Sequence, residues 1–289
     1  MCGIVGYVGP RRVVPVLLEG LRRLEYRGYD SAGLVYRFDN RLVRHRAGGK
    51  LANLEAVVDE HIGVASTIGL GHTRWATHGA PTEANAHPHA DCTGNLVVVH
   101  NGIIENYSAL RGELMARGHV FTSETDTEVI AHLIEDCLDG DLVAAVRTAL
   151  ARVEGSYAIG VLWTGAPDQL VAARNHSPLV MGVTADACLV ASDIPALLPF
   201  TREVIFLDDR EMAVLGRGTY TILSVDDGAP LDKPVTTIDW SAAMAEKAGF
   251  RHFMLKEIFE QPQAIRNTVS GRIVPDTGLV DLPEIGSCL

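Results

Sequence analysis

Short β-type runs dominate this chain, and three of its helical patterns follow one another instead of alternating with strands. Residues 2–8 form a β-rich run that ends at Gly9-Pro10, and an amphipathic helix follows with Val14, Leu17, Leu18, Leu21 and Leu24 on one face. Further β-type runs are predicted at residues 33–38, 42–47, 68–73, 96–100, 157–162, 170–173, 179–183, 188–191, 204–207, 212–215 and 220–223, and helical patterns at 107–117, 127–138 and 142–153. Because a doubly wound sheet needs strands and helices to alternate, this order favours stacked antiparallel sheets with helices on the outside.

The composition changes after about residue 223, where turn signals accumulate at residues 226–228 and 232–234. Residues 239–250 are typical of a polar connector. We therefore predict one domain over residues 2–240 and a connector over residues 241–289. Residues 253–272 carry apolar residues at helical spacing around Pro262, but too little chain follows to build a separate core, so this segment is expected to need a partner surface.

Charge and cysteine usage exclude several classes of partner. The net charge of −11 argues against a surface for nucleic acid or anionic lipid. No stretch approaches the roughly 18 apolar residues that a membrane span needs, and the N-terminal apolar run is too short for a secretory signal. The odd number of scattered cysteines fits reduced thiols, which are typical of the cytoplasm. We expect a soluble cytoplasmic protein that acts on a small molecule.

Cys2 stands directly behind Met1. Removal of Met1 would leave a thiol and a free α-amine on one residue, which is the smallest pair of nucleophile and base that a chain can form. The amine titrates near ~8 and the thiol near ~8.5, so modest shifts would suit acyl transfer at neutral pH. The alternative is that Cys2 only packs as a small residue entering a strand.

Two further pairs of residues suggest chemistry but have ordinary alternatives. Asn101 and Gly102 could hold an oxyanion through a side-chain amide and an unobstructed backbone N–H, although Asn-Gly is more often a hairpin turn. Arg74 and Asp126 could bind the carboxylate and ammonium ends of an amino acid. A surface salt bridge for Arg74 and a helix N-cap for Asp126 are the alternatives.

The histidines offer one possible metal site, and the glycines offer no nucleotide site. His87, His89, Asp91 and Cys92 could in principle bind zinc, but no second pair at ligand spacing accompanies them, and a polar turn near the site is the preferred interpretation. Glycine-rich phosphate loops are absent from the sequence. No metal and no cofactor is therefore expected.

The blocks together resemble the glutaminase domain of the glutamine:fructose-6-phosphate amidotransferases, over residues 2 to about 270. The resemblance is carried by the segments CGIVG at 2–6, YRGYDSAG at 26–33, HTRWATHG at 72–79, NAHPH at 85–89, HNG at 100–102 and Thr125-Asp126. It implies an α+β fold of the N-terminal-nucleophile hydrolase type, a four-layer αββα sandwich of two stacked antiparallel sheets flanked by helices.

The resemblance also implies roles for single residues. Cys2, freed by methionine removal, would attack the side-chain amide of glutamine, while Asn101 and Gly102 hold the oxyanion. Arg74 would bind the substrate α-carboxylate and Asp126 its α-ammonium. Thr77 and His78 would line the pocket, and Trp75 would separate the glutamine site from an ammonia channel.

Complete members of this family continue into a sugar-isomerase domain that takes fructose 6-phosphate to glucosamine 6-phosphate, and this sequence ends before that domain. We therefore expect glutamine hydrolysis from this chain, with the isomerase domain as its partner in cis in the full-length family. A non-catalytic glutamine-sensing module that retains Met1, and transfer to another acceptor through a partner chain, are the alternatives. A homodimer is among the arrangements left open.

Overall fold

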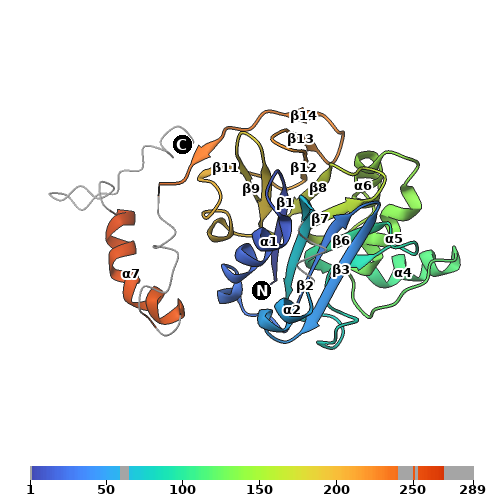
Figure 1. Ribbon diagram of the computed structural model, residues 1–289, viewed down its shortest axis with the longest axis horizontal. Helices are drawn as coiled ribbons and strands as arrows, with labels where there is room; N and C mark the ends of the chain where they lie inside the picture. The colour runs from blue at the N-terminus through green and yellow to red at the C-terminus, as the bar shows by residue number, and fades with distance from the viewer. Residues whose placement is uncertain (1, 59–64, 240–249, 251–252, 270–289) are drawn as a thin grey trace, which may run out of the picture. The chain divides into compact units, whose positions relative to one another are not determined.

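The computed structural model describes residues 2–58, 65–239, 250 and 253–269, and the chain divides into two compact units, Met1–Asp239 and Trp240–Leu289. Within the described part of the first unit, two antiparallel β-sheets are stacked (Figure 1). Sheet A has the order β15 (Thr236–Thr237), β11 (Glu203–Phe206), β9 (Val180–Val183), β10 (Cys188–Ala191), β1 (Gly3–Val8), β4 (Ile68–Arg74), β2 (Ser31–Phe38) and β3 (Arg41–Gly48). Sheet B has the order β14 (Pro230–Leu231), β13 (Tyr220–Ser224), β12 (Glu211–Leu215), β8 (Leu170–Asn175), β7 (Gly155–Trp163), β6 (Leu96–Ile104) and β5 (His89–Ala90).

Strand β6 shows why the sheets stack. Successive side chains of a strand point to opposite faces, and β6 buries both faces. Val97 and Val99 belong to the core between the two sheets, where they share a cluster with Ile4 of β1. Leu96 and Val98 belong to a second core, between sheet B and its helices. A strand that is apolar on both faces can only lie in an inner layer, which places β6 in the centre of the sandwich.

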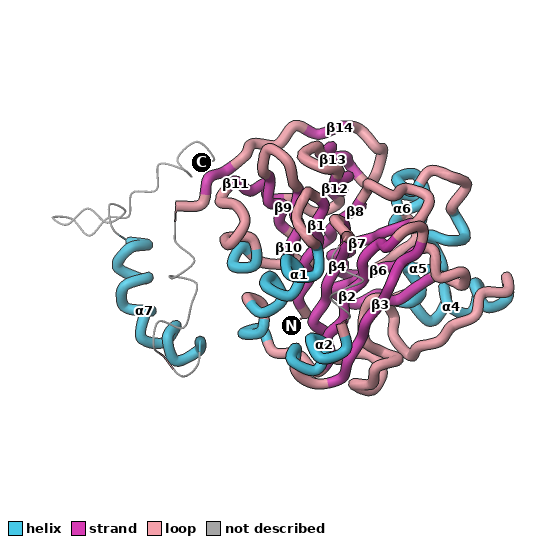
Figure 2. Tube along the Cα trace, in the orientation of Figure 1, coloured by secondary structure: helices cyan, strands magenta, loops and turns pink. Residues whose placement is uncertain are grey.

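Helices form the two outer layers (Figures 1 and 2). Helices α1 (Val13–Arg22) and α2 (Leu51–Val57) pack on sheet A, and helices α4 (Tyr107–Ala116), α5 (Glu128–Cys137) and α6 (Leu142–Leu150) cover sheet B. Glycine at position 71 of β4 allows α1 to approach closely, because a Cβ there would lie 3.0 Å from a methyl carbon of Leu21. Within the described residues, short 3₁₀ turns lie at Glu25–Arg27 and Ile194–Ala196.

The predicted fold class is confirmed, since the layers are helix, sheet, sheet and helix. Most element bounds lie within three residues of the predicted ones, and α2, β5, β14 and β15 were not predicted. Strand β6 continues to Ile104, beyond the predicted end at residue 100. In the second unit, α7 (Phe253–Val269) contains Pro262, and most of the predicted connector lies outside the described residues. No helix in the described part of the chain is long and apolar enough to cross a membrane.

Candidate active site

Cys2 lies at the start of β1, next to the loop that follows β4. Its Sγ accepts a hydrogen bond from the Trp75 backbone N–H at 3.2 Å and lies 3.5 Å from the Trp75 carbonyl oxygen. Burial raises the pKa of the Cys2 thiol, and the Trp75 N–H opposes that rise because it stabilises a thiolate. The thiol is therefore held at the start of the central strand β1 of sheet A by the backbone of the neighbouring loop.

Asn101 and Gly102 lie within β6, opposite Cys2. The Asn101 side-chain Nδ2 donates to the Cys2 carbonyl oxygen at 3.3 Å. Gly102 has φ of 136°, and a Cβ there would lie 2.0 Å from the Ser156 carbonyl oxygen, so only glycine fits. The hairpin-turn alternative for this pair is wrong, because both residues pair with β7 inside the sheet.

His72 of β4 fixes the orientation of the Asn101 amide. Its Nε2 lies 3.0 Å from the His100 carbonyl oxygen and 3.0 Å from Asn101 Oδ1. The carbonyl oxygen can only accept, so Nε2 carries the proton, and Asn101 must turn its oxygen to His72 and its NH₂ group to Cys2. Full burial lowers the pKa of His72 to about 3, so the ring stays neutral at physiological pH.

Three more buried histidines extend this cluster. The His87 ring stacks on His72 with centroids 4.0 Å apart, and His89 meets His87 edge-on at 4.8 Å. His100 Nδ1 accepts from the Thr127 hydroxyl at 2.8 Å if its Nε2 donates to Ser156. Burial lowers the pKa of all three. The predicted polar turn near the site is wrong for His89, which lies in β5, whereas His87 lies in the bend before β5 and lines the site.

Arg74 and Asp126 are buried near the same place. The Arg74 guanidinium donates to three carbonyl oxygens of its own loop. These are the oxygens of His78, of Gly79 at 3.1 Å and of Ala80 at 3.2 Å. Asp126 Oδ2 accepts the Ile104 N–H at 2.9 Å. Neither ordinary alternative holds: Arg74 is 3% exposed and bonds carbonyls, and the Asp126 carboxylate bonds a strand instead of capping α5.

Two adjoining cavities bring the predicted residues together. The larger, about 360 Å³, is lined by Cys2, Arg27, Trp75, Thr77, Asn101, Gly102, Ile103, Ser156, Ser177 and Pro178. The smaller, about 10 Å³, shares Cys2, Trp75, Thr77 and Gly102 with it and adds Arg74, His78, His87, His100, Thr125, Asp126 and Thr127. All eight predicted site residues therefore line one of two cavities that meet at Cys2.

The segment before β2 supports this site, which the sequence alone did not indicate. The Asp30 carboxylate accepts the Ala76 N–H at 2.5 Å, and the Asp30 N–H donates to the Arg74 carbonyl oxygen at 2.7 Å. Gly28, with φ of 75°, leaves room for the Trp75 ring, which a Cβ would approach to 2.7 Å. Position 28 therefore holds a glycine because the Trp75 ring occupies the space of a side chain.

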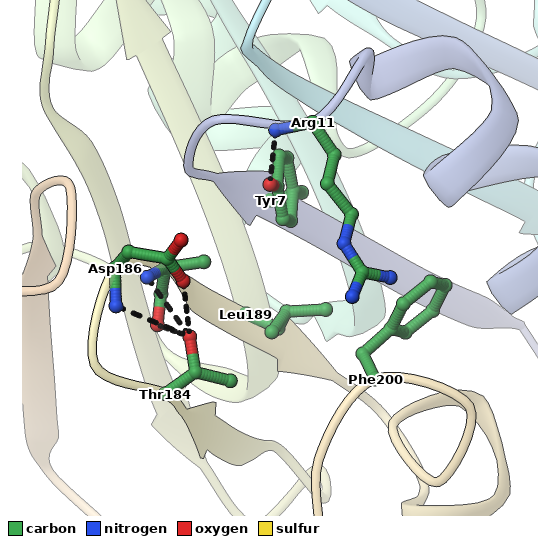
Figure 3. Close-up of a pocket in the computed structure, with 7 residues that line it drawn as sticks. Tyr7, Arg11, Thr184, Asp186, Leu189 and Phe200 are labelled. Carbon is green, nitrogen blue, oxygen red and sulfur yellow. Dashed lines mark hydrogen bonds between the residues drawn. The ribbon is translucent and has the colours of Figure 1, made fainter.

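A separate cavity of about 140 Å³ lies at the other end of β1 (Figure 3). Tyr7 Oη accepts the Arg11 N–H at 2.8 Å, and the Thr184 hydroxyl lies 3.1 Å from Asp186 Oδ1. The Arg11 guanidinium lies over the Phe200 ring at 5.9 Å. The first two contacts each stay within one turn, and the third joins the turn after β1 to the segment that follows the 3₁₀ turn at Ile194–Ala196. We assign them a structural role.

Comparison with known proteins gives the family of this site. Residues 72–199 match the model of the glutamine amidotransferase domain. The chain carries a class II glutamine amidotransferase domain. It is 52% identical over 286 residues to the glutamine–fructose-6-phosphate aminotransferase (isomerizing) of Symbiobacterium thermophilum, covering 99% of this chain and 47% of that protein. It is 50% identical to the enzyme of the same name from Pyrococcus horikoshii, covering 94% of this chain and 46% of that one.

The amidotransferase domain also resembles solved structures. The glutamine phosphoribosylpyrophosphate amidotransferase of Bacillus subtilis, solved with ADP and GMP, aligns with a TM-score of 0.66 at 25% identity, over 78% of this chain and 49% of that one. The N-terminal-nucleophile hydrolase fold is thereby confirmed. The chain spans about half the length of the curated relatives it matches, so the activity of the longer proteins does not transfer to it directly.

Proposed function

We propose that this chain hydrolyses the side-chain amide of L-glutamine to L-glutamate and ammonia, with Cys2 as the nucleophile after removal of Met1. The observation that carries the proposal is the hydrogen-bonded series from His72 through Asn101 to Cys2. It directs an amide N–H₂ toward the residue that would carry the attacking sulfur. Such preorganised donors are what an amide-cleaving thiol needs.

In the proposed reaction, the Cys2 thiol gives its proton to the α-amine of the same residue. The sulfur attacks the amide carbon, and the developing oxyanion is held by Asn101 Nδ2 and the Gly102 N–H. The C–N bond breaks, and the α-ammonium returns the proton so that ammonia leaves. Water, deprotonated by the same amine, then cleaves the thioester to release glutamate and restore the thiol.

Arg74 and Asp126 supply the opposite charges that a zwitterionic substrate needs. Both line the smaller cavity beside Cys2. We assign the α-carboxylate to Arg74, which would exchange bonds to its own loop carbonyls for substrate, and the α-ammonium to Asp126. We assign Thr77 and His78 to the pocket around the substrate backbone, and Trp75, 51% exposed, lines both cavities.

Incubating the purified chain with glutamine and measuring glutamate tests this proposal. We expect turnover that is lost in Cys2→Ala and kept in Cys137→Ala, a matched control at a cysteine on α5 that lines neither cavity. Intact mass must first establish that Met1 is absent. Turnover that persists in Cys2→Ala would overturn the assignment of Cys2 as the nucleophile. A Met1-free protein that binds but never hydrolyses glutamine would favour a glutamine-sensing module instead.

For the longer protein, we propose that the ammonia passes to a sugar-isomerase domain in cis and aminates fructose 6-phosphate to glucosamine 6-phosphate. The support is the activity for which relatives near 50% identity are named, and this chain covers about half of each. The chain alone should produce no amino sugar when given glutamine and fructose 6-phosphate. A chain extended with the isomerase domain should produce it, and amination of a different acceptor would contradict the proposal.

A further inference from the structure

Four side chains outside the active site converge on one point on the outer face of sheet B. Cys92 lies in the turn between β5 and β6, His119 follows α4, and His132 and Glu135 lie one turn apart on α5. Each side chain offers one ligand atom, and these four atoms all lie within 4.8 Å of one another. No step of the proposed reaction uses them.

The distances have the pattern of a coordination shell. The Cys92 Sγ lies 3.7 Å from His119 Nδ1 and 3.5 Å from His132 Nδ1. The two Nδ1 atoms are 3.4 Å apart, and Glu135 Oε2 lies 3.0 Å from the Nδ1 of His119 and 3.1 Å from that of His132. An ion with tetrahedral bonds of about 2.3 Å to sulfur and 2.0–2.1 Å to nitrogen and oxygen separates its ligand atoms by about 3.6 Å for sulfur–nitrogen pairs and about 3.3 Å for the others.

We propose that Cys92, His119, His132 and Glu135 bind one zinc ion. A thiolate, two imidazoles and a carboxylate are the donor types that zinc takes, and four protein ligands leave no open position, which is typical of a structural site. The thiolate and the carboxylate balance the charge of the ion. The sequence alone led us to expect no metal. Of the residues considered there for zinc, only Cys92 belongs to this set of four.

The far nitrogens of both histidines face carboxylates, as they do in most histidine–metal sites. His119 Nε2 lies 3.5 Å from Asp136 Oδ1, and His132 Nε2 lies 3.8 Å from Glu128 Oε1. Glu128 in turn accepts from the backbone and hydroxyl groups of Thr122 and Ser123. The ion would therefore join the β5–β6 turn, the α4–α5 loop and α5, whose first residue, Glu128, follows Asp126 and Thr127 of the active site.

Zinc content of the full chain tests the proposal. The Cys2→Ala background is used throughout, so that the N-terminal thiol cannot supply metal binding of its own. We expect one equivalent of zinc per chain, and we expect cobalt in its place to give a thiolate-to-metal charge-transfer band. Cys92→Ser, at an exposed position, should lose that band and weaken zinc binding more than about 100-fold, while Cys137→Ser should change neither.

Further variants separate ligation from a mere hydrogen-bonded cluster. His119→Gln should also weaken zinc binding more than about 100-fold, and Asp136→Asn by about 10–100-fold, the range for residues that orient a ligand. Chelator should lower the thermal midpoint of the parent chain and leave that of Cys92→Ser unchanged. Absence of stoichiometric zinc after zinc loading, or equal zinc affinity in the parent, Cys92→Ser and His119→Gln, would overturn the proposal.

Discussion

His72 offers a direct way to test how the oxyanion donor is held, because it touches Asn101 and not the cavity around Cys2. Replacing His72 with Met introduces an apolar side chain of similar size and removes the Nε2 proton. Two buried acceptors, Asn101 Oδ1 and the His100 carbonyl oxygen, each lose a partner that lay 3.0 Å away. Leaving buried acceptors unpaired costs about 1–3 kcal/mol each, so we expect the free energy of unfolding to fall by at least about 2 kcal/mol.

The fall in kcat should be no larger than the fall caused by removing an oxyanion-hole donor completely. Removing one oxyanion-hole donor lowers kcat by about 10²–10³-fold. In His72→Met the Asn101 amide remains but is free to turn, so we expect kcat for glutamine hydrolysis to fall about 10–100-fold, with KM changed less than about threefold, because the interaction forms in the transition state.

His72→Gln is the matched variant, since its amide N–H can replace the Nε2 donor. We expect it to recover kcat to within about tenfold of the parent. The assay is steady-state glutamate release, with circular dichroism to establish the fold of each variant. A folded His72→Met with parental kcat, or equal losses of kcat in the Met and Gln variants, would refute the positioning role.

Three further predictions follow from the same contacts. Gly102→Ala should lower the free energy of unfolding by about 2 kcal/mol or more, because its Cβ would lie 2.0 Å from the Ser156 carbonyl oxygen, and a chemical melt unchanged from the parent would contradict this. Asp126→Asn keeps an acceptor for the Ile104 N–H but loses the charge, so KM for glutamine should rise about 10–100-fold, measured by initial rates against Asp136→Asn as a control. His72 and His89 have pKa values lowered to about 3 by burial, so the unfolded chain binds protons that the folded chain does not once the pH falls below the ordinary value of 6.5. Stability to urea should then fall by up to about 1.4 kcal/mol per pH unit for each ring as the pH decreases toward 5, and His72→Gln should remove the His72 share.

The layers of the fold were predictable because burial leaves a periodic pattern. Strand β6 reads as an apolar run since both of its faces are covered, and α5 and α6 read as amphipathic helices since one face of each packs on sheet B. Short elements gave no such pattern. Helix α2 has only seven residues, and β5 has two, which is too few for periodicity to distinguish them from loops.

The candidate site was predictable in its residues but not in its support. Cys2, Asn101 and Gly102 carry recognisable chemistry, and the cavities bring them together with Arg74 and Asp126. His72 was part of a recognised segment, yet nothing in the sequence indicates that β4 places it 3.0 Å from a side chain 29 residues later.

The cluster around Cys92 was missed for the same reason. Its members come from a turn, a loop and a helix, with no ligand spacing except the short one between His132 and Glu135. Pairing Cys92 with the nearby His87 and His89 was reasonable in sequence, but those two rings lie in the buried cluster beside Asn101. Distance along the chain is therefore a poor guide to ligands that different elements supply.

Labelling with an electrophilic glutamine analogue, followed by peptide mapping, tests the central claim most directly. The account predicts a single adduct on the sulfur of Cys2, in an N-terminal peptide that begins at Cys2, with glutamate release lost in proportion to labelling and with excess glutamine protecting the site. An adduct on Cys92, Cys137, Cys188 or Cys288 that abolishes activity, or full activity in a chain whose mass still includes Met1, would contradict it.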